Sequence, residues 1–347
     1  SVDDSSPEVA REESLFRVGS VPGTNVTLTG DFIKELESHT AILGMTGSGK
    51  TELAFDLVRH AAANGVKVVC IDLTAQYAPR LADVSPVELS ISDEQAMKLG
   101  AKLFDVETGQ YGAGPEKKVL AEFADVVRSE IDQRLREFLA DTDHAVGLVE
   151  LREIANTKAT LWITDIYLST LLKLARDGVT TTKVLVVVEE AHTVMPEASF
   201  AGLGDFDSKG TVAKITQLAL QGRKYGVGLL VLAQRTATVS KSVLTQCNTV
   251  ISFACIDDTS INFLRNVFGD TVANGLPNLP RLRAIAHGPW INSGLPIAFD
   301  VPFSPSKAER TDWSSQRAAA ATAATVVAGA TETPEVMPPR GPDDPPF

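Results

Sequence analysis

The sequence has few cysteines, few aromatic residues and no long apolar run. Among its 347 residues there are only three cysteines, Cys70, Cys247 and Cys255, an odd number without the spacing of a metal site. We therefore expect three buried, reduced thiols in a cytoplasmic protein. No apolar run approaches the roughly 20 residues that a membrane span needs, and the N-terminus is acidic and polar. We expect neither a membrane segment nor a secretory signal.

The sequence also lacks an excess of positive charge. Its formal net charge is −12, so no general basic field attracts nucleic acid or an anionic membrane. Any contact with nucleic acid must come from local patches or from the lining of a channel.

Large apolar residues become scarce from about residue 305 onward, where Ala, Thr and Pro dominate. Such a stretch buries too little apolar surface to offset the entropy of ordering it, so we expect a disordered tail over 305–347. For residues 1–30 we expect a partly disordered lead-in with one or two short strands within 16–28. The remainder, 31–304, fits one α/β domain with a helical insertion at about 80–183.

The most informative stretch is the glycine-rich sequence GMTGSGKT at residues 44–51, which has the form G-x-x-x-x-G-K-[ST] of a Walker A motif. A strand-like apolar run precedes it at 40–43, and apolar residues at helical spacing follow at 52–63. Glycines allow backbone N–H groups to surround phosphate groups, and the helix N-terminus adds partial positive charge. We expect Lys50 to reach the β- and γ-phosphates of ATP, and the Thr51 hydroxyl to bind Mg²⁺. The predicted nucleotide-binding residues here are Gly44, Thr46, Gly47, Ser48, Gly49, Lys50, Thr51 and Glu52.

Acidic side chains follow two further buried strands. Residues 66–72 form a β-branched run that ends in Asp72, and five apolar residues at 184–188 precede Glu189 and Glu190. The carboxyl ends of parallel strands face the ligand crevice, so Asp72 either lines the site or caps a loop. The run at 184–188, followed by Glu189 and Glu190, has the arrangement of a Walker B motif. Glu189 is expected to hold the Mg²⁺ shell and Glu190 to orient and deprotonate the attacking water.

A third strand, at 225–235, ends in Gln234 and Arg235. Gln234 is placed to sense the γ-phosphate or the lytic water, and Arg235 joins the predicted nucleotide-binding residues. Further strands are expected at 249–255, 283–287 and 296–301, and helices at 116–141, 148–156, 161–177 and 261–268. A helical turn at 31–36 would be capped by Asp31. The order of five core strands predicts a RecA-like P-loop NTPase, α/β, with a mostly parallel sheet and helices on both faces.

Several stretches after the P-loop occur in the order of one known family. They are Ile71-Asp72 followed by Tyr77, EEAH at 189–192, GRKYGVG at 222–228, AQR at 233–235 and QCNT at 246–249. Together they resemble the HerA/FtsK group of ring-forming DNA translocases, HerA more closely, over about residues 35–300. The resemblance implies a hexamer with ATP at subunit interfaces and double-stranded DNA in a central channel. It also implies a catalytic role for Glu190, an action of Arg223 on the γ-phosphate and a sensor role for Gln234, with Asp72 lining the site.

The sequence departs from this family pattern at three places. HerA proteins usually carry an N-terminal β-barrel, whereas only a short lead-in precedes the P-loop here, so either the sequence is trimmed or assembly uses other surfaces. Ser38 stands where members often have an arginine that reaches a neighbouring subunit, and Leu282 stands where they tend toward glycine. An arginine finger contributes about 10³–10⁵ in rate. The residues that could replace it are Arg223, Arg235, Arg281 and Arg283.

Two segments are candidates for the wall of a DNA channel. The first is a predicted loop at 201–214 with Lys209 and Lys214, and the second is a loop at 236–242 with Lys241. Small polar residues and lysines suit sequence-neutral contacts with phosphates, although each lysine alone is equally consistent with a solvated surface charge. A ring would multiply one lysine into a circle of positive charge.

The favoured function is an ATP-driven translocase or helicase motor on double-stranded DNA, working as a homohexamer with a partner nuclease or another effector and without a membrane. An alternative is a nucleotide-gated scaffold that assembles and activates an effector with little translocation. A small-molecule kinase is a weaker alternative, because no acceptor-binding signature is present and the EEAH stretch suits hydrolysis.

Overall fold

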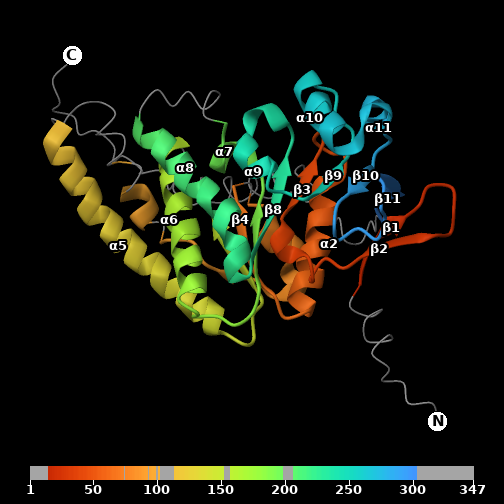
Figure 1. The fold of residues 1–347 in the computed structure, drawn as a ribbon. Helices are drawn as coiled ribbons and strands as arrows, with labels where there is room; N and C mark the ends of the chain where they lie inside the picture. Colours follow the sequence, from red (N-terminus) through yellow and green to blue (C-terminus); the bar gives the residue numbers. More distant parts are fainter. Residues whose placement is uncertain are drawn as a thin grey trace, which may run out of the picture. The chain divides into compact units, whose positions relative to one another are not determined.

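The computed structural model describes residues 15–73, 75–92, 94–98, 101, 113–151, 157–197 and 206–302. The expected tail at 305–347 and the first 14 residues of the lead-in lie outside this part. Within it, a single large sheet runs through the fold, with helices packed against it (Figure 1).

The sheet has eleven strands in the described residues, in the order β2-β1-β11-β10-β9-β3-β8-β7-β4-β6-β5. The strands from β9 to β5 are all parallel, and the remaining four pair antiparallel at one edge. The parallel strands are β3 (Thr40–Leu43), β4 (Lys67–Asp72), β5 (Val87–Glu88), β6 (Val146–Glu150), β7 (Val184–Val188), β8 (Val227–Ala233) and β9 (Thr249–Ser252). The antiparallel strands are β1 (Phe16–Ser20), β2 (Thr27–Gly30), β10 (Arg283–His287) and β11 (Ile297–Asp300). The predicted α/β class with a mostly parallel sheet is confirmed.

Helices bury both faces of the sheet, which explains the apolar strand sequences. In β7, Val184, Val186 and Val188 belong to one core, and Leu185 and Val187 belong to the other. Alternate residues of a strand point to opposite faces, so a strand that is covered on both sides needs an unbroken apolar run. The first core includes residues of α5 (Ala113–Ala140), α6 (Thr157–Arg176) and α8 (Phe206–Gln221), which lie side by side in Figure 1, and the second includes α2 (Lys50–Ala63).

Shorter helical segments connect these elements. The α-helical ones are α3 (Tyr77–Arg80), α7 (Ala191–Val194), α9 (Lys241–Leu244), α10 (Asp258–Phe268) and α11 (Asp270–Gly275). The 3-10 segments are η1 (Leu36–Ser38), η2 (Ala82–Val84), η3 (Gly222–Tyr225), η4 (Thr236–Thr238) and η5 (Leu276–Asn278). The expected helical turn at 31–36 is a turn that leads into η1, and its Asp31 Oδ1 accepts a hydrogen bond from Lys34 N at 3.3 Å.

The expected helix at 148–156 is wrong for residues 148–151, and residues 152–156 lie outside the described part. Residues up to Glu150 belong instead to strand β6, which pairs in parallel with β4. Gly147 in this strand lets the Leu89 side chain approach closely, because a Cβ there would lie 2.3 Å from Leu89 Cδ1. The segment at 80–183 therefore contributes the edge strand β5 and its neighbour β6 as well as the two confirmed helices α5 and α6. On α5, Val126 is exposed rather than part of the expected apolar stripe.

The three cysteines are free and buried, as predicted. Among the described residues, we find no helix with both the length and the apolar character to cross a bilayer.

Candidate nucleotide site

Four neighbouring parallel strands bring the predicted site residues to one edge of the sheet. The P-loop follows β3, Gln234 follows β8, Glu189 and Glu190 follow β7, and Asp72 ends β4. Strands β3 and β8 end at the same level, since Leu43 pairs with Ala233, and β7 ends nearby, since Val188 pairs with Val231. Because β8 lies between β3 and β7, the tip that carries Gln234 separates the P-loop from the two glutamates.

Lys50 is buried at the first turn of α2, and its ammonium lies over the P-loop. Its Nζ donates hydrogen bonds to Gly44 O at 2.8 Å and to Met45 O at 3.0 Å. Burial lowers the pKa of Lys50, whereas the nearby charges of Glu189 and Glu190 raise it. The lysine and the two carboxylates share one site although they lie far apart in the sequence, because Thr51, the neighbour of Lys50, donates to Glu189, the neighbour of Glu190, at 3.3 Å.

The loop around Lys50 requires glycine at two positions. Gly44 has a φ of 145° and Gly49 a φ of 121°, values that other residues rarely adopt. A Cβ at Gly49 would also lie 2.9 Å from Leu282 Cδ2. Leu282 itself has a φ of 65° and donates from its backbone N to Ser48 O at 2.9 Å. This positive φ explains why related proteins tend toward glycine at the position of Leu282. The strands after it, β10 and β11, form even with leucine there.

Glu189 lies between Thr51 and Tyr77. The Thr51 hydroxyl donates to Glu189 Oε1 at 3.3 Å, and the Tyr77 hydroxyl donates to Oε2 at 2.6 Å. Burial raises the pKa of Glu189, and the hydrogen bond from Tyr77 opposes this effect. Burial, together with the charge of Glu189, raises the pKa of Tyr77 well above its usual value, so the phenol remains a donor.

The structure thus brings together Thr51 and Glu189, the two residues expected to bind Mg²⁺. Among the described residues there is no cluster of three or more His, Cys, Asp or Glu side chains that could hold a metal by themselves. Mg²⁺ keeps several waters and commonly uses one or two protein oxygens plus substrate phosphates. A hydroxyl and a carboxylate at this spacing therefore fit Mg²⁺ bound together with a nucleotide.

Glu190 adopts a left-handed conformation, with φ 48° and ψ 50°, which costs about 1–2 kcal/mol for a residue other than glycine. In this conformation its Oε1 accepts a hydrogen bond from Gln234 Nε2 at 2.6 Å, and its Oε2 lies 3.2 Å from His192 Nδ1. The contact with His192 and the bond from Gln234 lower the pKa of Glu190, while partial burial opposes them. The pKa values of the two adjacent glutamates thus shift in opposite directions, an arrangement that separates the roles of paired carboxylates.

Asp72 shapes the chain that follows β4. Its carboxylate is fully buried and accepts hydrogen bonds from Ala75 N at 3.0 Å and from Tyr77 N at 2.9 Å. From the sequence, Asp72 is expected either to line the site or to cap a loop. These two bonds to backbone N–H groups are those of a residue that caps a loop. Tyr77 belongs to a stretch that resembles the HerA family but is not among the predicted site residues, because only the tertiary structure reveals that its hydroxyl reaches Glu189.

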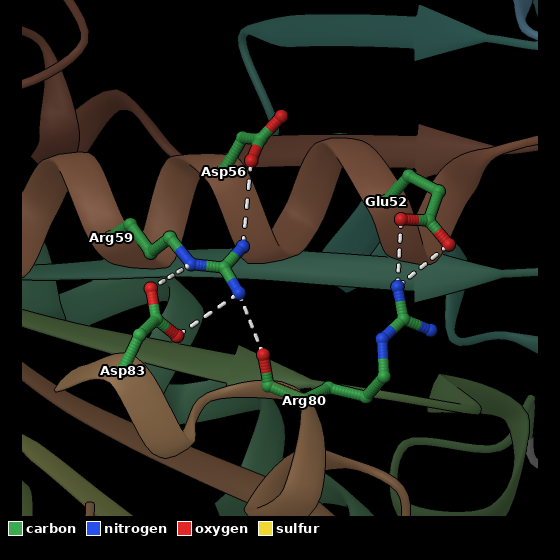
Figure 2. Close-up of polar contacts among 5 residues, drawn as sticks. All are labelled: Glu52, Asp56, Arg59, Arg80 and Asp83. Carbon is green, nitrogen blue, oxygen red and sulfur yellow. Dashed lines mark hydrogen bonds and ion pairs between the residues drawn. The ribbon is translucent and has the colours of Figure 1, made fainter. Parts of the chain in front are cut away.

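Glu52, an expected nucleotide-binding residue, forms an ion pair with Arg80 (Figure 2). Both carboxylate oxygens of Glu52 lie 2.7 Å from Arg80 Nη2. Beside this pair, Arg59 donates to Asp83 and to the Arg80 carbonyl oxygen at 2.6 Å (Figure 2). These contacts tie the P-loop helix α2 to the α3–η2 segment.

The structure does not bring Arg223 to this site. Arg223 lies on η3, before β8, whereas the site residues follow the carboxyl ends of the strands. The seven residues of β8 span about 23 Å at about 3.3 Å per residue, so Arg223 lies at the opposite edge of the sheet. Its side chain is exposed there.

The other arginines considered as fingers differ in their surroundings. Arg235 is exposed directly after Gln234 at the site edge. Arg283 donates two hydrogen bonds to Asp300, at 2.6 and 2.9 Å, and so links strand β10 to strand β11. Arg281 precedes Leu282, whose backbone contacts the P-loop.

The expected loop at 201–214 is wrong for residues 206–214, which belong to helix α8. Lys214 is exposed on this helix, with its Nζ 3.7 Å from Asp165 Oδ2, and the side chain of Lys209 lies outside the described part. Lys241 is exposed at the start of α9, after the short η4 segment.

Part of the chain is similar in sequence to known proteins. Residues 16–162 match the family model for the central domain of helicase HerA. Over these residues the chain resembles the central domain of HerA. It is 35% identical over 68 residues to the DNA double-strand break repair helicase HerA of Pyrococcus furiosus, an alignment that covers 20% of this chain and 11% of that protein. It is also 34% identical over 117 residues to a probable helicase of Methanocaldococcus jannaschii, covering 33% of this chain and 20% of the relative. The chain thus spans a fifth or less of the length of these curated relatives.

Solved structures of low sequence identity share the fold. VirB4 of Thermoanaerobacter pseudethanolicus superimposes on the chain with a TM-score of 0.60 at 12% identity, covering 84% of this chain and 97% of VirB4. The bacterial conjugative coupling protein TrwBdeltaN70 gives a TM-score of 0.51 at 11% identity, covering 85% of this chain and 91% of that structure. These likenesses confirm a P-loop ATPase fold.

Proposed function

We propose that this chain hydrolyses ATP as the motor of a HerA-type translocase or helicase acting on double-stranded DNA. The observation that carries the proposal is the convergence of Lys50, the Thr51–Glu189 pair and Glu190 at the carboxyl edge of one parallel sheet. The family match at residues 16–162 supports the same function.

In this mechanism, Lys50 exchanges its bonds with the loop carbonyls for bonds to the β- and γ-phosphates. Thr51 and Glu189 would hold Mg²⁺, and the ion would supply positive charge to the phosphates. Glu190 is held ionised by His192 and Gln234, and it accepts the proton of the attacking water. Gln234 bonds directly to Glu190, so it can link the state of the nucleotide to the position of the catalytic carboxylate.

The active unit in this proposal is a homohexameric ring with each nucleotide between two subunits. The exposure of Arg223 and its position away from Lys50 support a role toward the nucleotide of a neighbouring subunit. Lys241, Lys214 and Lys209 would contact the DNA backbone, and a nuclease or another effector would work with the ring in the cytoplasm.

The first test is the ATPase rate with and without double-stranded DNA, at several salt concentrations. Stimulation by DNA and a DNA affinity that falls steeply with salt are expected, because phosphate contacts release counterions. The Lys241→Ala variant should bind DNA more weakly, whereas Lys173→Ala, which removes an exposed lysine from the end of α6, should bind as the wild type does. DNA-independent turnover combined with salt-insensitive behaviour would argue against a motor.

A nucleotide-gated scaffold is the second candidate, and the surroundings of Ser38 favour it. Ser38 stands where related proteins often place an arginine; it is buried, and its Oγ donates to Glu35 O at 2.6 Å. An effector that is activated equally well by Glu190→Gln, which should bind ATP without hydrolysing it, would favour the scaffold.

A further inference from the structure

We infer that Tyr77 is a positioning residue that fixes the Glu189 carboxylate in the orientation needed to bind Mg²⁺ with Thr51. The inference rests on the proposed function, because it concerns the metal that accompanies the nucleotide. It adds a residue to the site that neither the Walker motifs nor the charge pattern identifies.

The contacts of Glu189 determine the plane of its carboxylate. Thr51 bonds to one oxygen and Tyr77 to the other, so the two donors together resist rotation of the group. The last torsion of a glutamate side chain is otherwise broad, and one donor alone would leave it free to turn. Tyr77 therefore leaves Oε1 directed to the Thr51 hydroxyl, on the side where the nucleotide phosphates are expected.

Tyr77 is itself held against the helix that carries Thr51. Its ring packs edge-on against Phe55, with the ring centroids 4.8 Å apart, and Phe55 lies one helical turn after Thr51 on α2. Its backbone N donates to Asp72 Oδ2 at 2.9 Å. The Glu52–Arg80 ion pair holds the other end of α3 to α2 (Figure 2).

Tyr77 therefore contacts α2 through Phe55 and Glu189 through its hydroxyl, and Glu189 in turn bonds to Thr51 on α2. A shift of α3 would move the Tyr77 hydroxyl and so release Glu189. Second-sphere donors of this kind typically change metal affinity or activity about 10–100-fold when they are removed.

The test compares two buried tyrosines that each donate one hydroxyl bond of 2.6 Å. In Tyr77→Phe the lost acceptor is Glu189 Oε2, and in the matched control Tyr167→Phe it is the backbone oxygen of Leu89, away from the site. Equilibrium binding of a fluorescent, non-hydrolysable ATP analogue is titrated with Mg²⁺ for the wild type and both variants, and thermal unfolding is recorded for each.

For Tyr77→Phe we expect the Mg²⁺ concentration at half-saturation to rise about tenfold or more, with unchanged binding of the analogue in the absence of Mg²⁺. Tyr167→Phe should titrate as the wild type does. In a Glu189→Ala background, the Tyr77→Phe substitution should cause no additional shift, since the tyrosine acts only through the carboxylate.

A Tyr77→Phe protein that titrates as the wild type does would overturn the inference, as would an equal shift in both tyrosine variants or a full additional shift in the Glu189→Ala background. If Tyr77→Phe fails to fold, Phe55→Leu replaces it: this variant keeps the hydroxyl but removes its ring support, so the half-saturation should rise, and an unchanged value would overturn the inference. A wild-type protein without any Mg²⁺-dependent binding would refute the proposed nucleotide site itself, and the inference would fall with it.

Discussion

Replacing Glu190 with glutamine should separate ATP binding from ATP hydrolysis. Glutamine has nearly the shape of glutamate, and its amide oxygen can still accept the bond from Gln234 Nε2 that Glu190 Oε1 accepts at 2.6 Å. The left-handed backbone at this position and the short helix α7 need not change. The substitution removes the negative charge, the ability to take a proton and the carboxylate oxygen that faces His192 Nδ1 at 3.2 Å.

The size of the effect follows from the role of a general base. Such a group contributes about 10²–10⁴ in rate, which corresponds to about 3–5 kcal/mol of the activation barrier. We therefore expect the Glu190→Gln turnover number to fall at least about 100-fold. The P-loop contacts remain, so the affinity for ATP should stay within about tenfold, although Lys50 loses one of the carboxylate charges that raise its pKa.

The assay measures steady-state phosphate release and, separately, the binding of a fluorescent ATP analogue. Glu88→Gln is a matched control, because Glu88 is an exposed carboxylate on the edge strand β5 of the same sheet. It should keep the wild-type rate. A Glu190→Gln enzyme that binds ATP and turns over at nearly the wild-type rate would refute the assignment of Glu190 as the base.

Three further outcomes are expected. Gln234→Leu should lower the turnover number about tenfold with little change in ATP affinity, because it removes the hydrogen bond to Glu190 and leaves the P-loop unchanged. A raised dissociation constant for ATP with an unchanged turnover number would contradict this. Arg223→Ala should lose activity as a pure oligomer but regain part of it when mixed with Glu190→Gln subunits, since some interfaces then contain both wild-type residues; no recovery in verified mixed rings would contradict a role between subunits. His39 is buried and neutral, donating to Ala219 O at 2.8 Å and accepting from Leu229 N at 3.1 Å, and burial lowers its pKa from 6.5. The unfolded state therefore binds more protons as the pH falls through about 6.5, so stability should decrease from about pH 7.5 to 5.5, and urea unfolding of His39→Gln should show a shallower decrease.

The sequence by itself determined the features that depend on local pattern. The five apolar residues of β7 predict a strand covered on both faces, and the spacing in the P-loop predicts a strand, a turn and a helix start. Because parallel strands of an α/β sheet present their carboxyl ends at one edge, the same pattern is enough to place Lys50 and Glu190 in a common site. Each of these predictions uses residues close together in the chain or a rule that holds for the whole fold class.

Only the tertiary structure decided which partner each side chain meets. The segment at 146–150 has apolar residues that suit a helix or a strand, and pairing with β4 makes it a strand. Glu52 directly follows the phosphate-binding motif, yet its carboxylate accepts hydrogen bonds from Arg80 on α3. Tyr77 meets Glu189 although 112 positions separate them, and Arg223 lies at the opposite edge of the sheet because it precedes rather than follows β8. Such contacts depend on strand order and helix packing, which bring distant residues together and leave no local signal in the sequence.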